Sequence, residues 1–205
     1  MNSHNTSPYH LRNWLLALLL FPSILTAQPD AKTLEDLSQR AMVQIVTIQG
    51  FLTSIAGAEN SQASRDRIRK ACLKLFAPDA TVEEKGRSGS GRVRPVGQYL
   101  DVLMRRGNRN PVIMNFKMLS ALNPANLKEV QRPDGSIAYS GKVRFDQHYC
   151  RTGRATQSNE AINKPNCDYQ DWTEKEVTIS LTRQRSQKGV FWLIEITEIS
   201  VINVR

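Results

Sequence analysis

The spacing of the apolar residues changes near residue 110, and this change constrains the fold more than any other feature of the sequence. Before it, apolar side chains recur every three or four residues, as in an amphipathic helix, in the segments 34–56, 62–76 and 95–106. After it, apolar and polar residues alternate, as in a strand with one buried face, in the segments 112–118, 137–145, 177–182 and 190–201. This order predicts an α+β domain whose N-terminal helices pack against an antiparallel sheet.

The last of these segments changes phase part-way along, which predicts that the sheet is strongly bent. Apolar residues occupy even positions from 190 to 196, but odd positions from 199 to 201. One extra residue near Thr197 or Glu198 would restore the pairing, so we expect a β-bulge there. A further short strand is expected over 79–83, and turns are indicated at 133–136 and 186–189.

The first 27 residues have the pattern of a secretory signal peptide. An apolar run from Trp14 to Leu25 follows Arg12 and precedes Thr26 and Ala27. The run is about a dozen residues long, whereas a membrane-spanning helix needs roughly 20, so we expect cleavage near Ala27. An uncleaved membrane anchor is the alternative. We therefore expect a single exported domain over 28–205, either periplasmic or secreted.

The chain is basic, with a formal net charge of +9. Removal of the leader would leave 27 basic and 19 acidic side chains, a net charge of +8, and twelve of the basic residues lie within 65–109. Arg87, Arg92 and Arg94 sit in or beside a glycine-rich segment and are candidate contacts to an anionic partner. The alternative is a solvated basic surface. Nucleic acid is not favoured, because no aromatic residues for base stacking are interleaved with these arginines.

Three cysteines in an exported chain suggest one disulfide and one free thiol. Cys150 and Cys167 flank a polar segment and are the expected pair, whereas Cys72 falls on the apolar face of a helix. A zinc site could be drawn from these two cysteines with His148 and Asp168, but the spacing matches no short ligand pattern. We expect no metal and no cofactor.

Two segments resemble the nuclear transport factor 2-like superfamily. Residues 73–82, Leu-Lys-Leu-Phe-Ala-Pro-Asp-Ala-Thr-Val, resemble the exit from the second helix in that superfamily, and residues 96–100 are similar to its following helix. The resemblance implies a cone-shaped fold over about 34–204, in which a bent sheet curls around a helix-lined pocket. The pocket residues would then be Tyr99, Leu103, Phe116, Tyr139 and Trp192.

The resemblance also implies what an enzyme of this fold would need. Such enzymes place an aspartate or histidine base and a tyrosine donor inside the cone, and the candidates here are Tyr99, Tyr139 and His148. His148 is the only histidine after the leader, and strand alternation places it on the face opposite the pocket. Asp101 follows Tyr99 by two helical positions, about 200° around the helix axis, so the helix aims no acid at the pocket.

These observations favour an exported, non-catalytic binding or interaction domain. It would hold a small apolar ligand in the cone or form a homodimer through its sheet. Two alternatives come from the resemblance: a small-molecule isomerase or dehydratase, and an envelope scaffold similar to the periplasmic subunits of type IV secretion systems. The scaffold requires the leader to remain as a membrane anchor.

Overall fold

The computed structural model describes residues 29–57, 59–85, 91–109, 112–132, 136–152 and 167–205. The helices in these ranges are α1 (Ala31–Ala56), α2 (Gln62–Leu73) and α3 (Val96–Arg109), with a short 3-10 helix, η3, at Pro124–Asn126. The strands are β1 (Phe76–Lys85), β2 (Gly91–Pro95), β3 (Val112–Met118), β4 (Lys128–Gln131), β5 (Ile137–Thr152), β6 (Cys167–Ser186) and β7 (Gly189–Val204). The expected leader, 1–27, lies outside the described residues.

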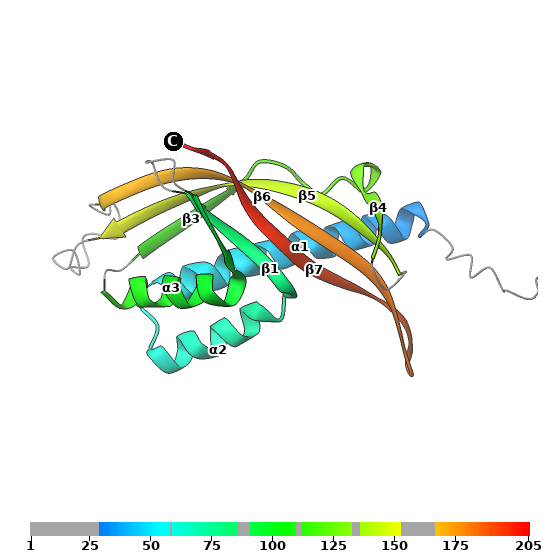
Figure 1. Cartoon of the computed structure of the whole chain (residues 1–205), viewed down its shortest axis with the longest axis horizontal. Coiled ribbons are helices and arrows are strands. Elements are labelled where there is room, and N and C mark those ends of the chain that lie inside the picture. The colour runs from blue at the N-terminus through cyan, green and yellow to red at the C-terminus, as the bar shows by residue number, and fades with distance from the viewer. Residues whose placement is uncertain (1–28, 58, 86–90, 110–111, 133–135, 153–166) are drawn as a thin grey trace, which may run out of the picture.

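These strands form one sheet that arches over the helices (Figure 1). The strand order is β2-β1-β7-β6-β5-β3, and β4 pairs separately with β5. The structure confirms the predicted fold class, helices packed against a strongly bent sheet. It corrects one detail, because β1 and β7 run parallel and the sheet is therefore mixed. β1 enters the sheet directly from α2 and pairs with the last strand, so no hairpin sets its direction.

The predicted bulge in the last strand is present. Thr197 is the extra residue between two consecutive pairs of the β6–β7 ladder. A second shift in the same ladder leaves Ile202 without a partner. Bulges bend a strand and increase its local twist, so two of them on one strand of this sheet account for part of the arch.

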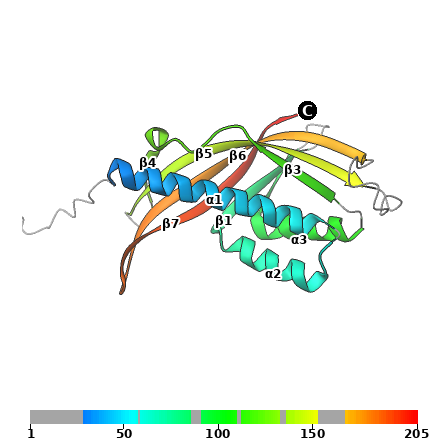
Figure 2. The same cartoon turned by 180° about the vertical axis from the view of Figure 1, so that it is seen from behind.

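Helix α1 lies along the concave face of the sheet and supplies one side of the core (Figure 2). Most of its predicted apolar stripe is buried, namely Leu37, Ala41, Ile45, Ile48, Leu52 and Ile55. The facing residues of the sheet are Val143, Val177, Ile179, Leu181 and Ile196. Because full burial of one aliphatic side chain contributes about 1.5–3 kcal/mol, this interface is a main source of stability.

Two strands, β2 and β4, were not predicted. Both are short edge elements, and none of their side chains is fully buried. A strand that buries neither face shows no apolar alternation in its sequence, so the pattern that indicates the longer strands is missing here.

The ends of two helices also differ from the expectation. Helix α1 begins at Ala31, because Asp30 Oδ1 accepts a hydrogen bond from the Thr33 backbone N–H at 2.7 Å and so caps the helix. Helix α2 ends at Leu73 rather than near residue 76. Pro78 lies within β1, where the pairing with β7 is irregular and a missing N–H is tolerated.

Helix α3 continues past the predicted end at residue 106 to Arg109. Gly107, within this extension, lets α3 approach the end of α1 closely. A Cβ atom at this position would lie 2.5 Å from the carbonyl oxygen of Ala56, which is backbone and cannot rotate away. The glycine therefore fixes the distance between the two helices.

The expected disulfide between Cys150 and Cys167 is confirmed, and it joins the end of β5 to the start of β6. Cys72 is a buried free thiol, and burial raises its pKa to about 12. Among the described residues, no helix is both long and apolar enough to cross a bilayer.

Candidate ligand-binding pocket

A pocket of about 590 Å³ opens between α3, the β1–β2 hairpin and the paired ends of β5 and β6. Strand alternation explains which side chains reach it. Alternate positions of a strand point to the same face. On β5 the positions that face the pocket are Gln147, Tyr149 and Arg151, and on β6 they are Asp171, Thr173 and Lys175. Helix α3 contributes Tyr99, Leu103 and Arg106, which lie on one helical face at steps of four and three residues.

Cationic side chains dominate the charge of this pocket. Six of the described lining residues are cationic and two are acidic; the cationic ones are Lys85, Arg92, Arg94, Arg106, Arg151 and Lys175. The acids are Glu84 and Asp171. The excess of positive charge favours anions inside the pocket.

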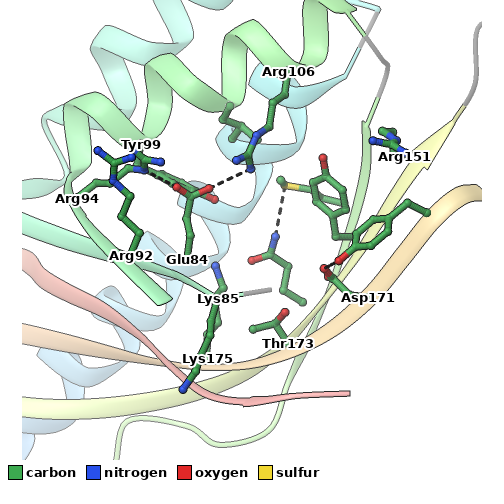
Figure 3. Close-up of a pocket in the computed structure, with 15 residues that line it drawn as sticks. Glu84, Lys85, Arg92, Arg94, Tyr99, Arg106, Arg151, Asp171, Thr173 and Lys175 are labelled. Carbon is green, nitrogen blue, oxygen red and sulfur yellow. Dashed lines mark hydrogen bonds and ion pairs between the residues drawn. The ribbon is translucent and has the colours of Figure 1, made fainter. Parts of the chain in front are cut away.

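Glu84 on β1 holds two of the arginines. Its carboxylate accepts from Arg94 Nε at 2.6 Å and from Arg106 Nη1 at 2.9 Å. Figure 3 shows these contacts on one side of the pocket, with Arg151 and Asp171 across from them. One carboxylate thus faces two guanidinium groups, which leaves this wall positively charged.

The remaining cationic groups are less well neutralised. Arg92 is exposed and has no ion-pair partner among the described residues. Arg151 is also exposed, and its guanidinium lies 5.8 Å from the centre of the Tyr169 ring. The hydroxyl of Tyr169 donates to Asp171 at 2.8 Å. Two guanidinium groups therefore remain available to a ligand without breaking an internal ion pair.

Lys175 is the most unusual residue of the site. It is only 6% exposed, and its ammonium lies 5.8 Å from the centre of the Tyr99 ring. No acid of the described residues lies within ion-pair distance of it. Burial lowers the pKa of Lys175 to about 8, although the negative charges of Glu84, Asp171 and Glu83 act in the opposite direction.

Gln147, which also lines the pocket, has little internal bonding. Oε1 of Gln147 is buried and has no hydrogen-bond partner in the described structure. Within the described ranges, the amide nitrogen of Gln147 donates only to the Met114 sulfur, at 3.7 Å. Thr173 is the cross-strand partner of Gln147 and lines the pocket beside it. Buried polar groups normally have partners, so these atoms mark a place where a ligand or water would bond.

Two of the five predicted pocket residues, Tyr99 and Leu103, line this pocket. The other three, Phe116, Tyr139 and Trp192, do not line it. Phe116 packs edge-on against Phe145, with ring centres 5.6 Å apart, and Tyr139 packs against Trp192 at 6.0 Å. All three are packed against the core that α1 forms with the sheet.

The three candidates for acid–base chemistry lie apart. Burial raises the pKa of Tyr99, which lines the pocket without an acid or histidine bonded to its hydroxyl among the described residues. Partial burial, together with the neighbouring Glu129, raises the pKa of Tyr139. His148 stacks on Trp172, with ring centres 4.4 Å apart, on the other face of the sheet. Its neighbour on that face, Asp146, is bonded to Arg205 at 2.9 Å.

Of the three candidate anion contacts, the structure brings Arg92 and Arg94 into the pocket through β2. Arg87 lies outside the described residues. Asp101 faces away from the pocket and pairs with Arg69 at 2.6 Å. No group of three or more histidine, cysteine or acidic side chains within the described ranges is arranged to hold a metal ion.

Sequence reasoning missed Glu84, Arg106, Arg151, Asp171 and Lys175. Arg151, Asp171 and Lys175 could have been found from the alternation of inward and outward positions along β5 and β6. Continuing the alternation past residue 145, and back from residue 177, places 147, 149 and 151 and also 171, 173 and 175 on the inner face. The alternation was followed along β5 only as far as His148 and Tyr149, and not back before residue 177 on β6, because the inward positions there are mostly polar.

The sequence matches no family model and no curated protein. Some solved structures show a weak likeness. A conserved protein from Planctomyces limnophilus is 12% identical with a TM-score of 0.38, over 80% of this chain and 99% of that one. A periplasmic fragment of TraM is 11% identical with a TM-score of 0.38, over 80% and 97%. ActVI-ORFA from Streptomyces coelicolor is 12% identical with a TM-score of 0.33, over 78% and 95%. These values are too low to assign a family or a ligand.

Proposed function

We propose that this protein is an exported binding domain. It would bind a small organic anion with an apolar body in the pocket between α3 and the paired ends of β5 and β6. The observation that carries the proposal is the charge of the pocket, six cationic groups against two acids around a cavity of about 590 Å³. This volume falls within the range of typical small-molecule sites.

The proposal changes the expected ligand from an apolar molecule to an anion. A wholly apolar ligand would cover Lys175 and the Gln147 amide without bonding to them, and unbonded polar groups are costly to bury. Leu103, Met114 and the ring of Tyr99 supply the apolar part of the wall. The exposed guanidinium groups of Arg92 and Arg151 suit a carboxylate, sulfonate or phosphate, since guanidinium can bond such groups in a bidentate way.

Ligand binding is favoured here over an isomerase or dehydratase and over a homodimer formed through the sheet. The three acid–base candidates are not gathered in one pocket, which argues against a proton-transferring enzyme. The outer face of the sheet is occupied by ion pairs, with Glu176 bonded to Lys142 at 2.6 Å and to Arg144 at 3.0 Å. A homodimer through that face would have to desolvate these charges, which costs free energy.

The test compares two fluorescent probes with the same ring system. One, 1-anilinonaphthalene-8-sulfonate, carries a sulfonate, and the other, N-phenyl-1-naphthylamine, is neutral. We expect the sulfonate probe to bind one per chain and at least tenfold more tightly. Arg151→Met and Lys175→Met should weaken its binding, whereas Lys188→Met, in the β6–β7 turn, should not. Equal affinity for both probes would contradict the proposed anion selectivity, and failure of both to bind would contradict the pocket.

A further inference from the structure

We propose that Lys175 captures a carbonyl group of the ligand as an imine, so that the pocket selects anions that also carry a keto or aldehyde group. This inference rests on the proposed function, since it requires that an organic anion enters the pocket. It goes further by naming a covalent bond, the atom that forms it and the functional group that the ligand must have.

The position of Lys175 distinguishes it from the other cationic groups of the pocket. The guanidinium groups either pair with Glu84 or, like Arg92 and Arg151, lie exposed. Lys175 alone is buried within the pocket, at 6% exposure, and among the described residues no acid neutralises it. The exposed guanidinium groups thus lie near the mouth of the pocket and the ammonium of Lys175 lies deeper. This arrangement suits a ligand with an anionic group at one end and a second polar group at the other.

The charges around Lys175 decide whether its amine is available as a nucleophile. Glu83 and Glu84 act from β1 and Asp171 from the same strand, and the Tyr99 ring lies over it from α3. Burial outweighs the three acids and lowers the pKa of Lys175 to about 8. At pH 7.5 about a quarter of such lysines are neutral, against about one in a thousand for a lysine with the ordinary value.

The chemistry is a reversible condensation that needs no redox partner. The neutral Nζ of Lys175 attacks the carbonyl carbon and gives a carbinolamine. One amine proton moves to the former carbonyl oxygen as the carbinolamine forms, and the nitrogen loses its second proton as that oxygen departs as water. The products are one imine and one water, and hydrolysis reverses the step. Phenylpyruvate has the required combination of carboxylate, keto group and apolar ring.

The test is reductive trapping of the wild-type protein with phenylpyruvate and sodium cyanoborohydride, followed by intact mass and peptide mapping. We expect one reduced adduct per chain, located on Lys175 and formed at least tenfold faster than adducts on the exposed Lys70 and Lys188, which lie outside the pocket. Its rate should rise with pH and level off near pH 8, whereas the rate at exposed lysines should continue to rise. Labelling spread over exposed lysines would overturn the inference.

A matched ligand separates this inference from the proposed function. 3-Phenylpropionate has the same ring and carboxylate but no keto group, so it should bind without forming an adduct and should slow the trapping of phenylpyruvate. Binding of 3-phenylpropionate without any phenylpyruvate adduct would overturn only the imine. Absence of binding by both would overturn the proposed function as well. Because these measurements use the wild-type chain, they do not depend on whether a Lys175 variant folds.

Discussion

Replacing Lys175 with methionine should make the protein more stable and at the same time a poorer binder. Methionine has a similar length and no charge, so it fits the same space without the desolvation cost. The pKa of Lys175 falls from the ordinary 10.5 to about 8, which corresponds to about 3 kcal/mol of destabilisation below pH 8. We expect Lys175→Met to recover about 1–3 kcal/mol at pH 7, because the substitution also removes contacts that the lysine stem makes.

The sign of the pH dependence follows from the lowered pKa. Between pH 8 and 10.5 the unfolded chain holds a proton on Lys175 that the folded chain does not, so wild-type stability gains from rising pH in this window. Lys175→Met lacks this gain. The difference in stability between the two proteins should therefore be largest below pH 8 and should vanish toward pH 10.5.

Urea unfolding at pH 7, 8, 9 and 10 measures this difference, and a thermal scan at pH 7 should show a melting temperature about 4–8 °C higher for the variant. Lys188→Met is the control, because Lys188 is exposed in the β6–β7 turn and should show neither effect. A Lys175→Met protein that is less stable than wild type at pH 7, or that keeps the wild-type pH slope, would refute the reasoning about this lysine.

Three further predictions concern helix packing, the disulfide and the acid of the pocket. Gly107→Ala should cost about 1–3 kcal/mol in urea unfolding, because its Cβ would meet the Ala56 carbonyl, whereas Gly50→Ala on α1, with nothing within 4 Å, should be neutral or stabilising. Equal changes in stability for the two variants would contradict the close approach of α3 to α1 at Gly107. Replacing Cys150 and Cys167 with serine should cost about 3 kcal/mol, and an unchanged melting temperature would show that the bridge contributes little. Glu84→Gln should tighten sulfonate-probe binding at least twofold, because it removes one of two acids; weaker binding would mean that Arg94 and Arg106 need Glu84 to hold them in position.

The elements that bury an apolar face could be predicted from the sequence. The stripe of α1 and the alternation along 177–182 are periodic because one side of each element faces the core. The bulge at Thr197 was predictable for the same reason, since an extra residue moves the apolar side chains to the other parity. The disulfide could be predicted because Cys150 and Cys167 flank a polar segment, whereas Cys72 falls on the apolar face of a helix.

The pocket could not be predicted from the same signal. The inward positions of β5 after Phe145, and of β6 before Val177, carry mostly polar and charged side chains because they line a cavity rather than a packed core. Alternation of apolar and polar residues is then lost, although the backbone remains a regular strand. The alternation could therefore be followed only part of the way along the pocket, to His148 and Tyr149 on β5, and not before residue 177 on β6.

This loss of pattern also supports the proposed role of Lys175. A sequence selected only for stability would place an apolar residue at an inward, 6% exposed position of a central strand, as Val177 and Ile179 do in the next two inward positions of β6. A buried lysine without a counter-ion costs stability that the rest of the core has to offset. Natural proteins commonly accept such a cost at sites where they bind or react, and rarely elsewhere. The stability lost at Lys175 and the binding gained there should thus change together, which is why the methionine variant tests both.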